Sequence, residues 1–236
     1  MPDTRDLSHW SPPRWPDAER LAGRYARLEL LDRDRHGAAL YDANLASDAI
    51  WDYLPYGPFK TVADYKDWIG QAAAGADPRF HAIFDLETQQ WGGVASYLRI
   101  TPQAGTIEVG HINYAPRLQR TRAATETMYL LMKWAFEAGY RRYEWKCNAS
   151  NLASRRAAQR LGLSYEGVFR QAAIVKGRNR DTAWFAAIDT EWPQLKAAFD
   201  AWLDPANFDA SGGQFQRLSD LTASVLVARD PALSDP

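Results

Sequence analysis

Three arginines gather where a predicted strand ends and the longest predicted helix begins. The segment NYAPRLQRTRAATE, residues 113–126, places Arg117, Arg120 and Arg122 at this junction. The first N–H groups of a helix have no partner within it, and the helix dipole adds partial positive charge there. Free N–H groups beside cations favour an anion such as phosphate. On the junction alone, a solvated basic turn is an equal alternative, because the segment has no glycine-rich loop.

Two residues that could accept a proton, Glu108 and His111, lie on the strand before this junction. Strand side chains alternate, so residues three apart face opposite sides of a sheet unless a bulge intervenes. Only one of the two is therefore expected to serve a site. Cys147 is a separate candidate nucleophile, but no His is an evident partner, and a buried structural thiol is the favoured interpretation.

The elements that position these residues follow from hydrophobic periodicity. Helical spacing predicts helices over 36–47, 61–74, 122–138, 153–162 and 190–203. Alternating patterns predict seven strands, over 23–31, 79–86, 91–100, 105–114, 141–147, 165–175 and 180–188. Thr61 and Asp64 resemble a capping box, with Asp in place of Glu. Residues 1–20 are expected to form an arm over a domain at 21–205, and residues 206–236 a loosely attached tail.

Composition excludes several classes of protein. Lys and Arg total 28 against 29 for Asp and Glu, so no global positive field is available for nucleic acid or an anionic membrane. One cysteine and four scattered histidines predict neither an intrachain disulfide nor a metal site. The beginning of the chain lacks an apolar segment of the kind that directs export, and no apolar run is long enough for insertion, so we expect a cytoplasmic protein.

Two longer runs resemble a known family. QRTRAATE (residues 119–126) and RRYEWKCNASNLASRRAAQRLGLSYEGVFR (residues 141–170) resemble the GNAT acetyltransferase superfamily, in its Rim-type ribosomal-protein acetyltransferase branch. The resemblance covers about residues 20–205. It implies an α+β fold with a mostly antiparallel seven-stranded sheet, splayed between its fourth and fifth strands, and with helices on both faces. It also implies acetyl-CoA in the split, with its pyrophosphate on the amides after the fourth strand.

The resemblance implies the cofactor-binding residues. The family's pyrophosphate loop has Gln or Arg, two residues, Gly, one residue, and then Gly or Ala. The matching positions are Gln119, Arg120, Thr121, Arg122, Ala123 and Ala124. Arg122 stands where the family has glycine, which departs from the pattern. Asn151 and Ser154 match a second feature, which makes Ser154 the proton donor or orienting group for the CoA sulfur, with Tyr165 as a weaker substitute. Asn151 could instead serve only as a helix N-cap.

The resemblance also implies the catalytic and acceptor groups. Glu108 is expected to act as the base, directly or through water, with His111 as the rival base. A backbone amide within 112–114 is expected to polarise the thioester carbonyl. The loop WDYLPYGPF and the turn KGRNRD are expected at the amine entrance. Aromatic walls and carboxylate-binding arginines would then come from Trp51, Tyr53, Tyr56, Phe59, Arg178 and Arg180, although a packed loop and a solvated hairpin would explain the same residues.

Together these features predict an N-acetyltransferase that moves acetyl from acetyl-CoA to a primary amine by direct attack in a ternary complex. The acceptor would be a small molecule or a protein N-terminal α-amine, and the enzyme a monomer or homodimer. A catalytically inactive CoA-binding regulator and an αβ protein-interaction module are the alternatives.

Overall fold

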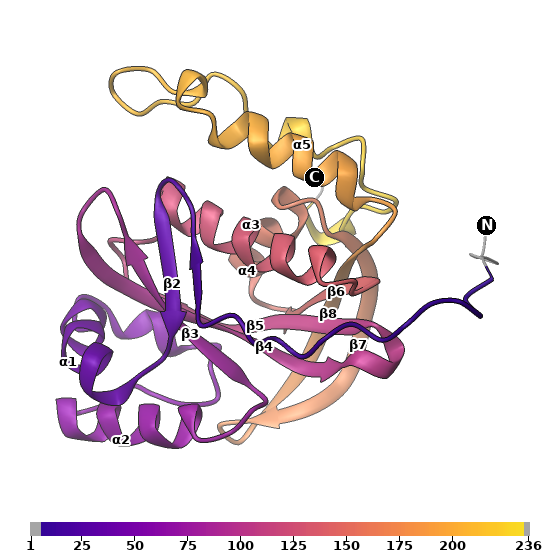
Figure 1. Ribbon diagram of the computed structural model, residues 1–236. Helices are drawn as coiled ribbons and strands as arrows, with labels where there is room; N and C mark the ends of the chain where they lie inside the picture. Colours follow the sequence, from indigo (N-terminus) through magenta and orange to yellow (C-terminus); the bar gives the residue numbers. More distant parts are fainter. Residues whose placement is uncertain (1–5, 234–236) are drawn as a thin grey trace.

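The computed structural model describes residues 6–233 and contains one open sheet of eight strands in the order β1-β2-β3-β4-β5-β6-β8-β7 (Figure 1). The strands are β1 (Arg20–Ala22), β2 (Ala26–Leu30), β3 (Arg79–Asp85), β4 (Gln90–Thr101), β5 (Thr106–Tyr114), β6 (Arg142–Asn148), β7 (Ser164–Val175) and β8 (Arg178–Ile188). All neighbouring strands are antiparallel except β5 and β6, which are parallel. The mixed α+β architecture expected from the sequence is confirmed.

Helices cover both faces of this sheet. They are α1 (Arg33–Asn44), α2 (Val62–Ala73), α3 (Arg122–Glu137), α4 (Leu152–Arg160), α5 (Trp192–Leu203) and the short α6 (Leu218–Leu221), with 3-10 turns at Asp48–Trp51, Pro102–Ala104, Pro205–Asn207 and Pro231–Leu233. In Figure 1, α1 and α2 lie on one side of the sheet and α3 and α4 on the other, with α5 outside α3. Two apolar clusters fill the layers, a large one under α3 and a smaller one under α1 and α2.

Local signals explain where two of the helices begin and end. The Thr61 hydroxyl accepts from the Asp64 N–H, and the Asp64 carboxylate accepts from the Thr61 N–H, so the predicted capping box starts α2. The Thr121 hydroxyl caps α3 by accepting from the Ala124 N–H, without a reciprocal side-chain bond, and Gly139, at a φ of 99°, follows the end of this helix.

The sheet has eight strands rather than the expected seven, because a tight hairpin replaces the single strand predicted over 23–31. The buried carboxylate of Glu126 on α3 accepts hydrogen bonds from the N–H groups of Arg24, Tyr25 and Ala26, at 2.8, 2.6 and 2.7 Å. These bonds hold the turn that separates β1 from β2. Since Glu126 lies about a hundred residues away in the sequence, periodicity within the segment carries no sign of the turn.

The two ends of the described chain pack onto the domain. The Tyr140 hydroxyl donates to the Arg14 carbonyl at 3.2 Å, so the N-terminal arm lies near the end of α3. Leu218, Thr222 and Asp230, which follow α5, are buried. The expectation of a loosely attached tail over 206–236 is therefore wrong for residues 218–233, because buried apolar and polar groups tie this part to α4 and α5.

Candidate active site at the split of the sheet

The sheet splits between its two parallel strands. Thr106–Val109 of β5 pair with Arg142–Trp145 of β6, and the pairing ends there, although β5 continues to Tyr114 and β6 to Asn148. The carboxyl ends of the two strands therefore diverge. The β6-facing edge of β5 from residue 110 onward is left for a ligand, in the place where open sheets of this kind bind one.

The N-terminus of α3 forms one wall of this split. Thr121 caps the helix, but no hydrogen bond among residues 6–233 engages the N–H groups of Arg122 and Ala123. These first-turn amides and the helix dipole suit a phosphate. Gln119 stabilises the turn between β5 and α3, since its side-chain Nε2 donates to the Tyr114 carbonyl at 2.9 Å. Arg120 is exposed and takes the left-handed conformation, at a φ of 63°.

Arg122 does not need to be glycine here. Its backbone is the first residue of α3, in the ordinary helical conformation, so no left-handed φ is required. Its guanidinium pairs with the Glu87 carboxylate and lies 4.8 Å from the ring centroids of both Tyr25 and Phe208. The side chain is thus held by its neighbours, and its amide stays free. Arg117 is also engaged, because it donates to the Trp91 carbonyl.

The other wall is α4, which follows β6. The Asn151 side chain accepts from the Ser154 N–H at 3.1 Å, so Asn151 caps this helix. The Ser154 hydroxyl accepts from the Trp145 indole N–H at 3.0 Å and lies close enough to the Cys147 thiol to affect its pKa. Burial raises the pKa of Cys147, which keeps the thiol protonated. Cys147 therefore supports the helix as a packed side chain, and an acyl-carrying role has no structural support.

A β-bulge brings both candidate bases onto one face of β5. Glu108 pairs with Leu98 and Gly110 with Ser96, but the next partner, Val94, pairs with Asn113, so the register shifts across His111. His111 has a φ of 50°, and its ring stacks on Tyr56 at 5.6 Å between centroids. Its second ring neighbour, Phe80, lies opposite Ser96. The bulge breaks the alternation that would otherwise place Glu108 and His111 on opposite faces of the sheet. Both side chains therefore face the side covered by α1 and α2.

Glu108 is buried between two cations. Its carboxylate accepts from Arg99 at 2.7 Å and lies 2.9 Å from the Lys146 ammonium on β6. Burial raises the pKa of Glu108 above its ordinary value, although both cations act in the opposite direction. The Glu108–Lys146 pair joins β5 to β6 at the point where the split begins.

His111 lies nearer the open part of the same face. Burial, together with the positive charges of Arg99 and Arg180, lowers the pKa of His111 to about 4. The imidazole is therefore neutral at neutral pH. Its side chain makes no hydrogen bond to any other residue in the 6–233 range, so a nitrogen lone pair is available.

The aromatic loop of residues 51–59 lies over this face, but its four aromatic side chains differ in placement. Trp51 is only 3% exposed, and both it and Phe59 pack into the small core around Tyr65. Tyr53 is exposed, and its hydroxyl donates to the Ser150 carbonyl at 3.4 Å, across the split. Tyr56 lies against His111. Tyr53 and Tyr56 therefore border the site, whereas Trp51 and Phe59 belong to the core.

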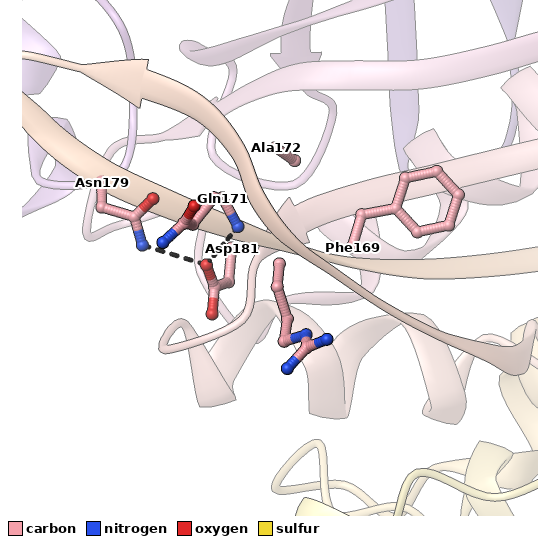
Figure 2. Close-up of a pocket in the computed structure, with 6 residues that line it drawn as sticks. Phe169, Gln171, Ala172, Asn179 and Asp181 are labelled. Carbon is pink, nitrogen blue, oxygen red and sulfur yellow. Dashed lines mark hydrogen bonds between the residues drawn. The ribbon is translucent and has the colours of Figure 1, made fainter.

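The terminal hairpin of β7 and β8 meets this loop. Lys176 at its tip donates to the Trp51 carbonyl at 3.0 Å. Arg180 is half-buried and close enough to His111 to lower its pKa, whereas Arg178 is exposed. An open hollow of about 810 Å³ lies on the hairpin itself, where a bulge in β7 leaves Asp181 to accept from the Gln171 N–H and the Asn179 amide (Figure 2). Its lining contains none of the predicted site residues.

Comparison with known proteins decides what kind of enzyme this geometry belongs to. A family model described as "Acetyltransferase (GNAT) domain" matches residues 27–164, more than half of the chain. The chain belongs to the GNAT acetyltransferase family. The family resemblance predicted from the sequence is confirmed, and the protein is an acetyl-CoA-dependent acyltransferase.

Three relatives illustrate the range of similarity to this GNAT enzyme. The crystal structure of a GCN5-related N-acetyltransferase from Brucella melitensis is 42% identical, with a TM-score of 0.90 over 92% of this chain and 100% of that chain. An uncharacterized N-acetyltransferase, YnaD, from Bacillus subtilis (strain 168) is 26% identical over 65% of this chain and 88% of its own length. RimL, a ribosomal L7/L12 alpha-N-protein acetyltransferase, shares the fold, at 21% identity and a TM-score of 0.62 over 72% of this chain and 94% of its own.

Residues 6–233 contain no group of His, Cys, Asp and Glu side chains that could hold a metal ion. In the same range no helix is both long and apolar enough to cross a membrane.

Two charged residues of the GNAT site escaped the sequence reasoning. Arg99 on β4 and Lys146 on β6 both contact Glu108, and Lys146 also lies 2.7 Å from Glu144 and 3.8 Å from the ring centroid of Trp184. The alternation in RRYEWKC does mark Lys146 as part of a polar strand face. Its partner becomes visible only once the register of β5 against β6 is known.

Proposed function

We propose that this GNAT enzyme is an N-acetyltransferase that transfers acetyl from acetyl-CoA to a primary amine by direct attack in a ternary complex. The observation that carries the proposal is the split itself. The free amides of α3 border it, and two candidate bases lie on the face of β5 that the aromatic loop covers. A donor and an acceptor could thus meet at the exposed edge of β5.

The proposed cofactor site uses both walls. Within the turn at residues 120–124, the free amides of Arg122 and Ala123 would hold the pyrophosphate. Arg120 is a nearby cation whose side chain makes no hydrogen bond or ion pair in the described chain, and Gln119 supports the turn. Asn151 fixes the first turn of α4 and thereby places Ser154. Acetyl-CoA supplies an activated thioester when bound. Arg122 replaces the family's glycine but takes the ordinary helical conformation, so this replacement does not favour an inactive regulator over an enzyme.

Proton transfer is assigned to the face that carries Glu108 and His111. We propose Glu108 as the base that takes the proton of the acceptor amine through water, because burial raises the pKa of Glu108 above its ordinary value, whereas burial lowers the pKa of His111. His111, with a free lone pair beside Tyr56, remains the rival base and could otherwise orient the amine. Ser154 would donate to the departing thiolate, with Tyr165 as the weaker substitute. An amide within 112–114 would polarise the thioester carbonyl.

The proposed acceptor is a small-molecule amine or a protein N-terminal α-amine that carries a nearby carboxylate. Tyr53 and Tyr56 would contact its apolar part. Arg180 faces the site, and its buried Nε atom has no hydrogen-bond partner among the described residues, so a carboxylate would satisfy it. Arg178 at the exposed tip is a weaker candidate for the same role. The single buried Cys147 supports the proposal of a reducing, cytoplasmic setting.

Thermal stabilisation followed by turnover tests the proposal. Acetyl-CoA and free CoA should raise the melting temperature in a concentration-dependent way, and NAD should not. A panel of amines with and without an adjacent carboxylate should then yield acetylated products, identified by mass spectrometry. Stabilisation by CoA esters without any turnover would favour the inactive regulator, and the absence of stabilisation at saturating ligand would contradict the proposed function.

A further inference from the structure

The C-terminal segment, defined here as residues 218–233, packs against α4 from one end to the other (yellow in Figure 1). At the end of the helix, the Thr222 hydroxyl donates to the Arg160 carbonyl at 3.1 Å. Near the start, Asp230 reaches Arg155. Between them, the Val227 N–H donates to the Ser164 hydroxyl at 2.9 Å, and the Tyr165 N–H donates to the Ala228 carbonyl at 3.1 Å. The segment thus fixes α4 and the beginning of β7 together.

The strongest of these contacts is a buried ion pair. Arg155 donates to both carboxylate oxygens of Asp230, at 2.6 and 2.5 Å, in the two-pronged geometry that fixes orientation as well as distance. The two residues are 6% and 1% exposed. Arg155 also donates to the Ala149 carbonyl at 2.7 Å, and the Asp230 N–H donates to the Gln159 side chain at 2.7 Å. Arg155 and Asp230 together therefore connect the loop before α4, the body of the helix and the C-terminal segment.

The helix itself buries few side chains. Of the nine residues of α4, only Arg155 and Ala158 are buried. Ser154, whose hydroxyl meets Trp145 and Cys147 on β6, is the residue directly before Arg155. A rotation or outward shift of this first turn would carry Ser154 away from β6. The side chains on α4 that contact the sheet are small, whereas the buried Arg155–Asp230 pair ties this turn to the C-terminal segment, which lies outside the residues matched by the family model.

We propose that Asp230 is a positioning residue for acetyl transfer, which acts through Arg155 to hold Ser154 at the split. The inference rests on the proposed role of Ser154 toward the CoA sulfur. It makes the C-terminal segment a functional part of this enzyme, because the α4 wall of the cofactor site takes its position from residues 75 positions away in the sequence.

Cys147 offers a direct readout of this position. It is the single cysteine of the chain, is buried, and lies near Ser154 on the strand that α4 covers. Its reaction rate with a disulfide reagent such as DTNB therefore reports how often α4 moves away. In full-length Asp230→Asn, at a temperature where circular dichroism shows the protein folded, we expect labelling to be about tenfold faster. We also expect kcat to be about tenfold lower, with the KM for the amine unchanged.

Thr222→Val is the matched control, since it removes the contact at the far end of the same helix and keeps the size of the side chain. It should lower the melting temperature while leaving the labelling rate and kcat near those of the wild type. If Asp230→Asn labels and turns over like the wild type, or if both variants change labelling and kcat equally, the proposal is wrong. The labelling experiment uses no substrate, so a failure of the proposed function would leave its result intact.

Discussion

The α3 wall of the split buries thirteen of its sixteen residues, whereas the α4 wall buries two of nine. The first is therefore held mainly by the hydrophobic effect, spread over many side chains, and the second mainly by a few directional polar contacts. This difference indicates where the enzyme should tolerate amino-acid substitutions. Substitutions on the α3 side should lower stability in proportion to the apolar surface that they remove. Single polar groups should matter most near α4 and where β5 pairs with β6.

The largest effect is expected at Glu108, which joins the strands that carry the two walls. In Glu108→Gln we expect kcat to fall by roughly 10²–10⁴, the range for a lost general base. The wild-type rate should fall on the acid side as Glu108 is protonated. Because its pKa is raised above the ordinary value of 4.5, this fall should lie above pH 4.5 and be absent from the variant.

Glu144→Gln is the matched control, because Glu144 also contacts Lys146 from the same face. It should retain kcat within a few-fold of the wild-type value. If Glu108→Gln keeps its activity and His111→Asn loses it, His111 is the base.

A second prediction concerns the α3 side, where His81 is buried on β3 and its ring lies against Tyr97. Burial lowers the pKa of His81 to about 4, so the unfolded chain binds this proton at a higher pH than the folded protein. Stability should be unaffected above about pH 6.5 and fall as the pH drops toward 4, by roughly 3 kcal/mol from this group.

Urea unfolding of His81→Phe across this pH range should show a flatter dependence than the wild type. His9→Phe, at an exposed position of the arm, should follow the wild-type curve. Equal slopes in the wild type and His81→Phe would show that His81 does not resist protonation in the fold.

A third prediction concerns Arg180 on β8, the strand that pairs with β6. For acceptors that carry a carboxylate, Arg180→Met should raise the KM about 10–100-fold, since hydrogen bonds to charged groups contribute roughly 1.5–3 kcal/mol. The KM of acceptors without a carboxylate should stay the same. Arg178→Met tests the weaker candidate at the exposed tip and should raise the KM of carboxylate-bearing acceptors less. An unchanged KM for these acceptors in Arg180→Met would remove Arg180 from the acceptor site.

The smallest effect is expected at Arg122, on the robust α3 wall. Its side chain pairs with Glu87, and the amide of the same residue is the group that suits phosphate. Arg122→Gly should therefore change the Kd for acetyl-CoA less than about threefold, with a small loss of stability from the missing ion pair. Isothermal titration provides the Kd, and a loss above about tenfold would mean that the guanidinium itself binds the cofactor.

The same comparison explains how far the sequence predicts this protein. The helix beginning near residue 122 and the capping box at Thr61 follow from spacing, because the signal for each lies within a few residues of the element. The β1–β2 hairpin, the position of the C-terminal segment and the Glu108–Lys146 pair each depend on residues far apart in sequence. Glu126, Asp230 and Lys146 are ordinary charged residues until the fold brings them to their partners.

The candidate site divides in the same way. The junction at 119–124 and the capping role of Asn151 could be predicted, since both belong to local strand-to-helix turns. The bulge at His111 could not, and it decides that Glu108 and His111 share a face. Composition alone likewise could not separate Tyr53 and Tyr56, which border the site, from Trp51 and Phe59, which pack in the core.

Amide hydrogen exchange with and without acetyl-CoA tests the central claim most directly, because the claim names the backbone groups that meet the cofactor. The account predicts protection of residues 110–114 on β5, of 120–124 at the start of α3, and of 151–155 on α4, with little change in the β1–β2 hairpin. Protection confined to other parts of the chain, or none at saturating acetyl-CoA, would contradict the assignment of the split as the active site.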